Sequence, residues 1–248
     1  MRLEQKHPCP HCYCKNTVKN GKTYYGKQNY KCKSCRRQFV ERDDNPFDHY
    51  AESLIGALLL ERISLRGIGR VLGKSLSWIY HRMKPLWECL PDELPTGGLE
   101  SAEISLLCLE ADEMWSFVGA KDCPEWIWLA IERRTRLVAG FHVGGRDEEG
   151  AKGLLLDIPD RILEKSLIFS DDLPSYTAAV PKGQLQQEGK GQTTKIERIN
   201  NTIRQRCSRL VRKSLSFSKK WENHYFAIKY FLVNYNLDIL AKNASLYK

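Results

Sequence analysis

The sequence predicts a multidomain protein in which a metal-binding segment and a small helical domain precede a larger α/β domain. Three observations support this order. Two C-x2-C pairs lie within the first 35 residues, a proline- and glycine-rich stretch at 91–98 interrupts the chain, and beyond it the apolar periodicity changes from helical to strand-like. A chain of 248 residues has room for several domains. We place them at 1–45, 46–90 and 105–248, with a linker at 91–104.

The net charge of +9 is unevenly distributed along the chain. Lys and Arg outnumber Asp and Glu by 11 to 4 in residues 1–45 and by 12 to 3 in residues 191–248. The balance is reversed in residues 96–190, which carry 10 basic and 17 acidic side chains. Basic ends around an acidic middle predict a protein that holds a polyanion over a site that binds cations.

Cysteine usage and hydropathy predict a cytoplasmic protein that does not enter a membrane. No signal peptide is recognisable, and no run of about 18 apolar residues could span a bilayer. The nine cysteines are too irregularly spaced for a disulfide framework, and five of them lie within the first 35 residues. This distribution favours a metal site in a reducing compartment.

The N-terminal segment carries the ligand pattern of a zinc site. Cys9 and Cys12 form one C-x2-C pair, and Cys32 and Cys35 form the other. Each pair presents two thiolates on a tight turn, and two facing turns close a tetrahedral Zn²⁺ site. We therefore expect 1–45 to be a zinc ribbon with a short hairpin between the pairs, in which the metal replaces a core. Three further potential ligands leave the set open: His7, His11 and Cys14.

The segment 46–90 has the pattern of three short helices. Tyr50–Arg62 is helical in its periodicity, Ser64 can cap a second helix, and Gly73 ends that helix before a third, which starts at Ser75 or Ser77, runs to about Met83. Two helices joined by a glycine turn match a helix-turn-helix, although any small helical bundle could look alike. The residues expected to contact DNA here and in the ribbon are Lys33, Arg36, Arg37, Ser75, Ser77, Trp78, His81 and Arg82.

Beyond the linker the pattern is that of a sheet with helices. Strands are expected at 106–118, 126–132 and 137–143, a helix at 147–156 and a fourth strand at 167–169, because these stretches are rich in β-branched and aromatic residues between turn signals. Three strands, a helix, a fourth strand and further helices are the order of an RNase H-like domain. A polar loop, 181–192, separates the fourth strand from those last helices.

A helix after residue 193 carries an isolated acid. Glu197 is the one carboxylate among nine Lys and Arg in 193–220, and Arg204, two turns later, shares its edge of the helix. The apolar stripe of this helix comprises Ile196, Ile199, Ile203, Cys207 and Leu210. A last helix begins near Trp221, and its aromatic stripe is expected to be core.

Three acids are expected to meet at one edge of the sheet. Asp112 lies in the first strand, Asp171 follows the fourth strand, and Glu197 lies on the late helix. Converging carboxylates repel one another unless divalent cations share them, and two such ions can activate a water and stabilise a leaving oxygen. Glu113 should point to the opposite face, since side chains alternate along a strand. Arg204 could stabilise a phosphate or restrain the carboxylate.

Four motifs resemble the IS1-family transposases of the DDE type: LEADEMWSFVGAK (109–121), SDDLPSY (170–176), TTKIERIN (193–200) and RKSLSFSKK (212–220). The resemblance also includes the zinc and helical segments, so it spans nearly the whole chain. The two halves, which are separate reading frames in many relatives, form one continuous chain here.

The resemblance implies a function and a set of site residues. It implies recognition of terminal inverted repeats by the N-terminal part, then DNA strand cleavage and strand transfer that depend on Mg²⁺ or Mn²⁺. It also implies double-stranded DNA as partner, at least a dimer for synapsis, and a location at the prokaryotic nucleoid. The catalytic acids carried over are Asp112, Asp171 and Glu197, helped by Asn200 and Arg204. Further DNA contacts are expected from Arg209, Arg212 and Lys213.

Two positions leave questions open. The family places Gly-Trp after the second acid, whereas this chain has Asp172 and Leu173, so Asp172 could substitute for Asp171. His224 also falls on a family position, but it could equally be a packed histidine.

Two other functions fit parts of the sequence. A zinc ribbon and a helix-turn-helix alone would suit a sequence-specific DNA-binding regulator with an inactive RNase H-like scaffold. A structure-selective nuclease would hydrolyse DNA without joining strands. The three acids favour an enzyme over the regulator.

Overall fold

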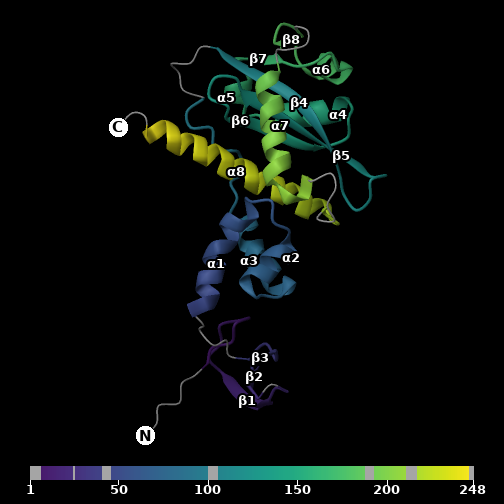
Figure 1. Cartoon of the computed structure of the whole chain (residues 1–248). Helices are drawn as coiled ribbons and strands as arrows, with labels where there is room; N and C mark the ends of the chain where they lie inside the picture. Colours follow the sequence, from purple (N-terminus) through teal and green to yellow (C-terminus); the bar gives the residue numbers. More distant parts are fainter. Residues whose placement is uncertain are drawn as a thin grey trace. The chain divides into compact units, whose positions relative to one another are not determined.

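The computed structural model describes residues 7–24, 26–40, 46–99, 106–187, 193–210 and 217–245. The chain divides into two compact units, Met1–Tyr50 and Ala51–Lys248. The first contains a small sheet and the second contains a larger sheet with helices, which confirms the mixed α/β class (Figure 1). Among the described residues, none of the helices combines the length and the hydropathy needed to cross a bilayer.

The first unit is a three-stranded antiparallel sheet in the order β1-β2-β3. Its strands are β1 (Thr17–Lys22), β2 (Gln28–Cys32) and β3 (Gln38–Val40). The predicted hairpin is confirmed by the pairing of β1 with β2. Among the described residues 7–24 and 26–40, the one buried apolar side chain other than cysteine is Tyr30, whose ring stacks on Phe39 with centroids 5.7 Å apart. So small a core cannot stabilise a fold unaided.

Three helices follow: α1 (Pro46–Leu59), α2 (Leu65–Leu72) and α3 (Leu76–Glu88). The predicted cap Ser64 is present, and of the two predicted starts of the third helix Ser75 is its cap, because both hydroxyls accept hydrogen bonds from the first turns of α2 and α3. Gly73 ends α2 with a φ of 61°, in the left-handed region that suits glycine.

The third helix extends past Met83, where the sequence predicted its end. Met83 and Trp87 are buried one turn apart, and the Trp87 ring stacks on Phe226 of α8 (Trp221–Ser245) with centroids 5.7 Å apart. This packing continues the helix through Pro85. The core between α2, α3 and α8 therefore belongs to the same unit as the large sheet.

The large sheet has the strand order β6-β5-β4-β7-β8. Its strands are β4 (Leu107–Phe117), β5 (Pro124–Glu132), β6 (Val138–Gly144), β7 (Ser166–Phe169) and β8 (Leu185–Gln186). The first three are antiparallel neighbours, whereas β7 pairs parallel with β4 and β8 pairs parallel with β7. The two-residue strand β8 lies in the stretch predicted as a loop, where polar composition concealed it.

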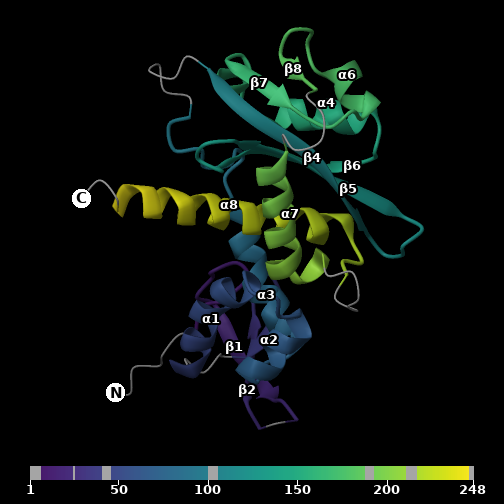
Figure 2. The same cartoon turned by 45° about the horizontal axis from the view of Figure 1, so that its top comes forward.

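Helices cover both faces of this sheet (Figures 1 and 2). One face packs against α4 (Glu148–Asp157), α5 (Asp160–Leu163) and α6 (Pro174–Ala179). The other packs against α7 (Thr194–Arg206) and α8. The predicted apolar stripe of α7 is buried along its whole length, although the helix ends at Arg206 and a 3₁₀ turn, Ser208–Leu210, completes the stripe.

The segment predicted as a linker is described as far as residue 99, and there it packs onto the second unit. Leu94 and Leu99 are buried, and a Cβ at Gly97 would collide with Leu240 of α8. Asn236 of α8 donates from Nδ2 to the Pro95 carbonyl at 3.0 Å. The same amide clamps β6, because its Oδ1 accepts from the Val138 N–H at 2.9 Å and its Nδ2 donates to the Val138 carbonyl at 2.8 Å.

Candidate active site and zinc site

The four cysteines of the two C-x2-C pairs meet in the first unit. Their sulfur atoms all lie within 4.8 Å of one another. Cys9 and Cys35 are 3.6 Å apart, as are Cys12 and Cys32. Tetrahedral zinc with Zn–S bonds of about 2.3 Å requires sulfur atoms about 3.8 Å apart. The cluster therefore has the size and the ligand type to hold one zinc ion.

The spare ligands are engaged elsewhere. Cys14 lies outside the cluster, and its sulfur accepts from the Ser34 hydroxyl at 2.9 Å. His11 Nδ1 lies 3.2 Å from a guanidinium nitrogen of Arg37, one of the predicted phosphate-binding residues. Backbone N–H groups, that of Cys35 above all, lower the pKa of Cys32 and so favour the thiolate that binds zinc.

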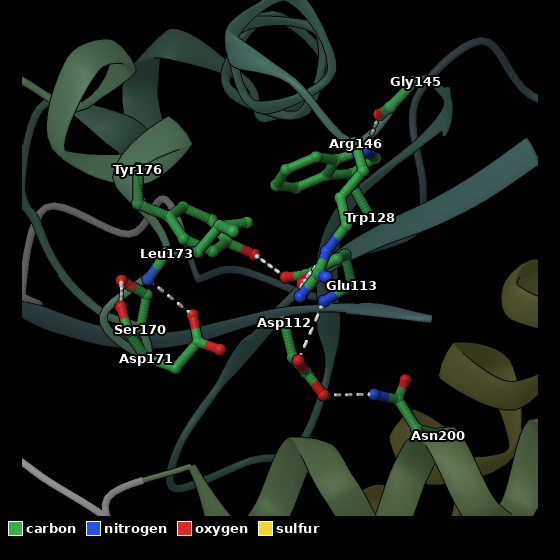
Figure 3. A network of polar contacts seen from close by, with 10 residues as sticks. All are labelled: Asp112, Glu113, Trp128, Gly145, Arg146, Ser170, Asp171, Leu173, Tyr176 and Asn200. Carbon is green, nitrogen blue, oxygen red and sulfur yellow. Dashed lines mark hydrogen bonds and ion pairs between the residues drawn. The ribbon is translucent and has the colours of Figure 1, made fainter. Parts of the chain in front are cut away.

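In the second unit, Asp112 lies in the middle of β4 and faces α7. Its Oδ2 accepts from Asn200 Nδ2 at 2.7 Å, and its Oδ1 accepts from the Glu113 N–H at 2.9 Å (Figure 3). Burial, together with the charges of Glu113, Asp171 and Glu197, raises the pKa of Asp112 to about 7. The other two predicted acids, Asp171 and Glu197, therefore both act on the Asp112 carboxyl group.

The other two acids are more open. Asp171 follows β7 and is exposed, with its Oδ1 accepting from the Leu173 N–H at 3.2 Å. Glu197 lies in the first turn of α7 and is also exposed. The ligand atoms of Asp112, Asp171 and Glu197 do not all lie within 4.8 Å of one another, a spacing that the four cysteines alone satisfy in the described ranges. The acids thus face one region without forming a closed cluster.

The residues present fit a divalent metal with oxygen ligands. Carboxylates and amide oxygens are the donors that Mg²⁺ prefers. Besides the three acids, Asn200 contributes a buried Oδ1 atom with no hydrogen-bond partner in the described part of the chain. Buried amide oxygens are rarely left unpaired, so this atom suits a ligand or a water in the site.

Glu113 lies on the opposite face of the sheet, as strand alternation predicted. Its carboxylate accepts from Arg146 at 2.6 and 2.9 Å and from the Tyr176 hydroxyl at 3.4 Å (Figure 3). The Arg146 guanidinium lies 4.6 Å from the centroid of the Trp126 ring. Glu113 is therefore held in an ion pair behind the strand.

Glu110 was not singled out from the sequence, yet it is 1% exposed and fully hydrogen bonded. Its Oε2 accepts from the N–H groups of Lys195 and Ile196 at 3.0 and 2.9 Å, and its Oε1 accepts from Arg133 Nε at 3.0 Å. Strand alternation could have placed Glu110 on the face of Asp112. The two helix residues that donate to it, however, lie 85 and 86 positions further along the sequence.

Comparison with known proteins decides the family. The IS1 transposase family matches residues 105–237, more than half of the chain. The chain belongs to the IS1 transposase family.

Named relatives agree with this assignment. The InsB protein of insertion element IS1 2 from Escherichia coli strain K12 is 33% identical over 155 residues, 62% of this chain and 90% of the relative. The InsB protein of insertion element iso-IS1n from Shigella dysenteriae is 40% identical over 130 residues, 52% of this chain and 95% of the relative. These matches support a transposase role.

Three other predicted positions of this IS1 transposase lie in the region that the family matches. Arg204 is half-buried on α7, and Asp172 is exposed beside Asp171. His224 is fully buried, with Nε2 3.1 Å from the Ser116 hydroxyl. Burial, together with the charge of Arg209, lowers the pKa of His224 to about 4, so the ring is neutral at pH 7. His224 is thus a packed histidine.

The predicted DNA-binding residues of α3 differ in availability. Ser77 and His81 are exposed, whereas Ser75 is occupied as the cap of the helix. Arg82 is half-buried, pairs with Glu52 at 3.2 Å and lies 5.1 Å from the Trp78 ring centroid. Of the remaining candidates, Lys33, Arg36 and Arg37 are exposed, Arg209 is half-buried, and Arg212 and Lys213 lie outside the described residues.

Proposed function

We propose that this IS1 transposase binds the terminal inverted repeats of its element and performs metal-dependent DNA strand cleavage and strand transfer. The observation that carries the proposal is the environment of Asp112. Its buried carboxyl group is hydrogen bonded to Asn200 and acted on by the charges of Asp171 and Glu197. A carboxyl group whose pKa is raised towards neutrality by burial and by neighbouring carboxylates is typical of a functional site rather than of a structural ion pair.

The topology supports an RNase H-like fold for the catalytic domain, which we assign to 105–248. Three antiparallel strands, followed by two strands parallel to β4, form the sheet. In this arrangement β4, the end of β7 and the start of α7 each carry one acid. The segment α2–Gly73–α3 supports a helix-turn-helix in 46–90, and the cysteine cluster supports a zinc ribbon in 1–45.

Asp112, Asp171 and Glu197 would hold Mg²⁺ or Mn²⁺ at the site. Such ions supply Lewis-acid activation of a water or a DNA 3′-hydroxyl and stabilise the leaving oxygen. Asn200 orients Asp112 through the bond from Nδ2 to Oδ2. Arg204 lies two turns from Glu197 on the same helix, where it can face a DNA phosphate.

DNA binding follows from the charge distribution. The exposed cations of the ribbon would contact phosphates, which gives affinity without sequence information. The exposed Ser77 and His81 of α3 are placed to contact base edges, whereas Arg82 would have to leave Glu52 to do so. Because transposition joins two ends, we propose that the active form is at least a dimer.

A nicking assay on end DNA tests this function. Asp112→Asn, Asp171→Asn and Glu197→Gln each remove a charged ligand and little volume, so DNA binding should persist while Mg²⁺-dependent cleavage is lost. Glu113→Gln and Asp172→Asn should retain cleavage. If cleavage survives Asp112→Asn but not Glu113→Gln, the site lies on the face of β4 that carries Glu113, and the proposed site is wrong.

The same assay separates the alternatives. A DNA-binding regulator would bind the ends and nick nothing. A nuclease would nick the ends but would not join a 3′ end to target DNA, which a strand-transfer assay measures directly.

A further inference from the structure

The helix that carries Glu197 and Asn200 begins without a cap of its own. The residue before α7, Thr193, makes no side-chain hydrogen bond to the first turn. The first N–H groups of a helix have no partner within the helix and need an acceptor. For α7 the acceptor is Glu110 Oε2 of β4, which takes the N–H groups of both Lys195 and Ile196.

Glu110 also connects these two elements to β7. Its second oxygen accepts from Arg133 Nε, and the Arg133 guanidinium lies 3.9 Å from the centroid of the Phe169 ring. Phe169 is the residue of β7 that pairs in register with Glu110. The buried Glu110 carboxylate thus lies on β4, accepts hydrogen bonds from the start of α7 and, through Arg133, reaches the end of β7. These three elements carry or precede the acids of the site.

Each acid of the site lies one or two residues from Glu110, Phe169 or Ile196. Asp112 follows Glu110 by two positions on the same face of β4, Asp171 follows Phe169 by two, and Glu197 follows Ile196 by one. Like charges repel, so the acids cannot hold this arrangement by contacts among themselves. We propose that Glu110 is a positioning residue, which fixes α7 and β7 against β4 so that the three acids face one metal site. This inference rests on the proposed function for the identity of the metal ligands.

The ionised form of Glu110 suits this role. A carboxylate at a helix N-terminus is favoured by the helix dipole, and its hydrogen bonds are stronger than those of a neutral acceptor. Arg133 compensates the buried charge. A glutamine at this position must turn its NH₂ group either towards the helix N–H groups or towards Arg133, and both are donors.

Amide exchange tests the cap directly. In the full-length, zinc-loaded protein, Glu110→Gln should speed hydrogen exchange of the Lys195 and Ile196 amides by about tenfold or more, the effect expected from losing a charge-assisted bond. Glu113→Gln is the matched control, because it also removes the charge of a buried carboxylate paired with arginine on β4, but on the other face. It should leave these two amides protected. Equal exchange of both amides in the two variants would overturn the proposal.

Metal binding tests the consequence. Mn²⁺ binding is followed by the signal of free Mn²⁺ in solution. The part of the binding that Asp112→Asn abolishes is assigned to the site. Glu110→Gln should raise the half-saturating Mn²⁺ concentration by about 10- to 100-fold, as is usual when a residue that orients a ligand is removed. A loss of stability alone divides the apparent dissociation constant by the folded fraction, so it shifts this concentration by less than about twofold as long as more than half of the protein is folded.

A backbone pair keeps the test decisive if Glu110→Gln folds poorly. Lys195→Pro removes one of the two N–H donors in the first turn, where proline is tolerated, while Lys195→Ala keeps it. Both variants lose the bond from Lys195 Nζ to the Arg133 carbonyl. Lys195→Pro should therefore weaken Mn²⁺ binding more than Lys195→Ala, and equal values would overturn the role of Glu110.

The two proposals fail in different ways. If Glu110→Gln changes amide exchange and Mn²⁺ binding as expected but the wild-type protein does not cut end DNA, the proposed function is wrong and the positioning role stands. If it cuts end DNA and Glu110→Gln matches it in exchange and in Mn²⁺ dependence, the positioning role is wrong and the function stands.

Discussion

The cysteine cluster and the proposed acid site both offer metal ligands, yet these ligands are assembled in opposite ways. The four sulfur atoms come from two short turns 20 to 26 residues apart and already lie within 4.8 Å of one another. The three acids come from β4, the end of β7 and α7, and their oxygens do not share that spacing. Cys9 and Cys32 are buried and Cys12 is exposed, whereas of the acids Asp171 and Glu197 are both exposed.

The difference fits the roles that we propose for the two metals. A structural zinc site must be complete, because the ion supplies stability that a small core lacks. A catalytic site must stay open to substrate, so its ligands are held by the fold around them. In the first unit the metal would organise the protein, and in the second the protein organises the ligands.

The largest effect is expected from breaking the cysteine cluster. Cys9→Ser with Cys12→Ser should release the zinc and unfold residues 7–40, because structural zinc contributes about 10–16 kcal/mol in small domains. Metal analysis and limited proteolysis measure this. The second unit should keep its melting temperature.

Cys14→Ser is the matched control, since its sulfur bonds to Ser34 and lies outside the cluster. It should keep about one zinc per chain. Zinc content that falls with Cys14→Ser and not with the double variant would mean that the ligand set is wrong.

Removing the acid Asp112 should raise the free energy of unfolding, whereas breaking the cysteine cluster should destabilise the protein. The pKa of Asp112 is raised from 3.8 to about 7 in the folded protein, so the unfolded state loses this proton first as pH rises. Without divalent metal, the free energy of unfolding should therefore fall between pH 4 and pH 7 because of this group. Asp112→Asn removes that fall, so the free energy of unfolding of this variant should exceed that of the wild type by up to about 4 kcal/mol above pH 7.

Urea unfolding in buffer free of Mg²⁺ measures the gain. All six Trp residues lie in the second unit, so their fluorescence reports that unit alone. A wild type that is more stable than Asp112→Asn at pH 7.5 would contradict the repulsion on which the comparison depends.

A smaller effect is expected behind the strand. Arg146→Met leaves the buried Glu113 carboxylate without its cation and should destabilise the second unit by about 2 kcal/mol at pH 7.5. The cost should shrink at pH 5, because burial raises the pKa of Glu113 and the group can then take up a proton.

The double variant Glu113→Gln, Arg146→Met checks the pairing. Its cost should be less than the sum of the two single costs, since the residues are in direct contact. Strictly additive costs would show that the ion pair does not stabilise the protein.

Local signals made much of the fold predictable from sequence. The C-x2-C spacing, the caps Ser64 and Ser75, and the turn at Gly73 depend on neighbouring residues and were all found. Elements that depend on distant packing were less predictable. The extension of α3 beyond Met83 requires α8, and the two-residue strand β8 requires β7 as its partner.

The same distinction applies to the site. Strand alternation separated Asp112 from Glu113, because that rule needs only the strand itself. Glu110 was missed because its task is to cap a helix 85 residues away. Nothing local marks a glutamate as the cap of a distant element, and Thr193 before α7 is a residue type that can cap a helix although its side chain does not do so here.

The clamp of Asn236 on β6 has a consequence for self-association. β6 is the outer strand of the sheet, and outer strands expose N–H and C=O groups that recruit strands from other chains. At Val138 one carboxamide occupies both groups, as the backbone of a neighbouring strand would. A single side chain thus blocks strand addition at this point of the sheet edge.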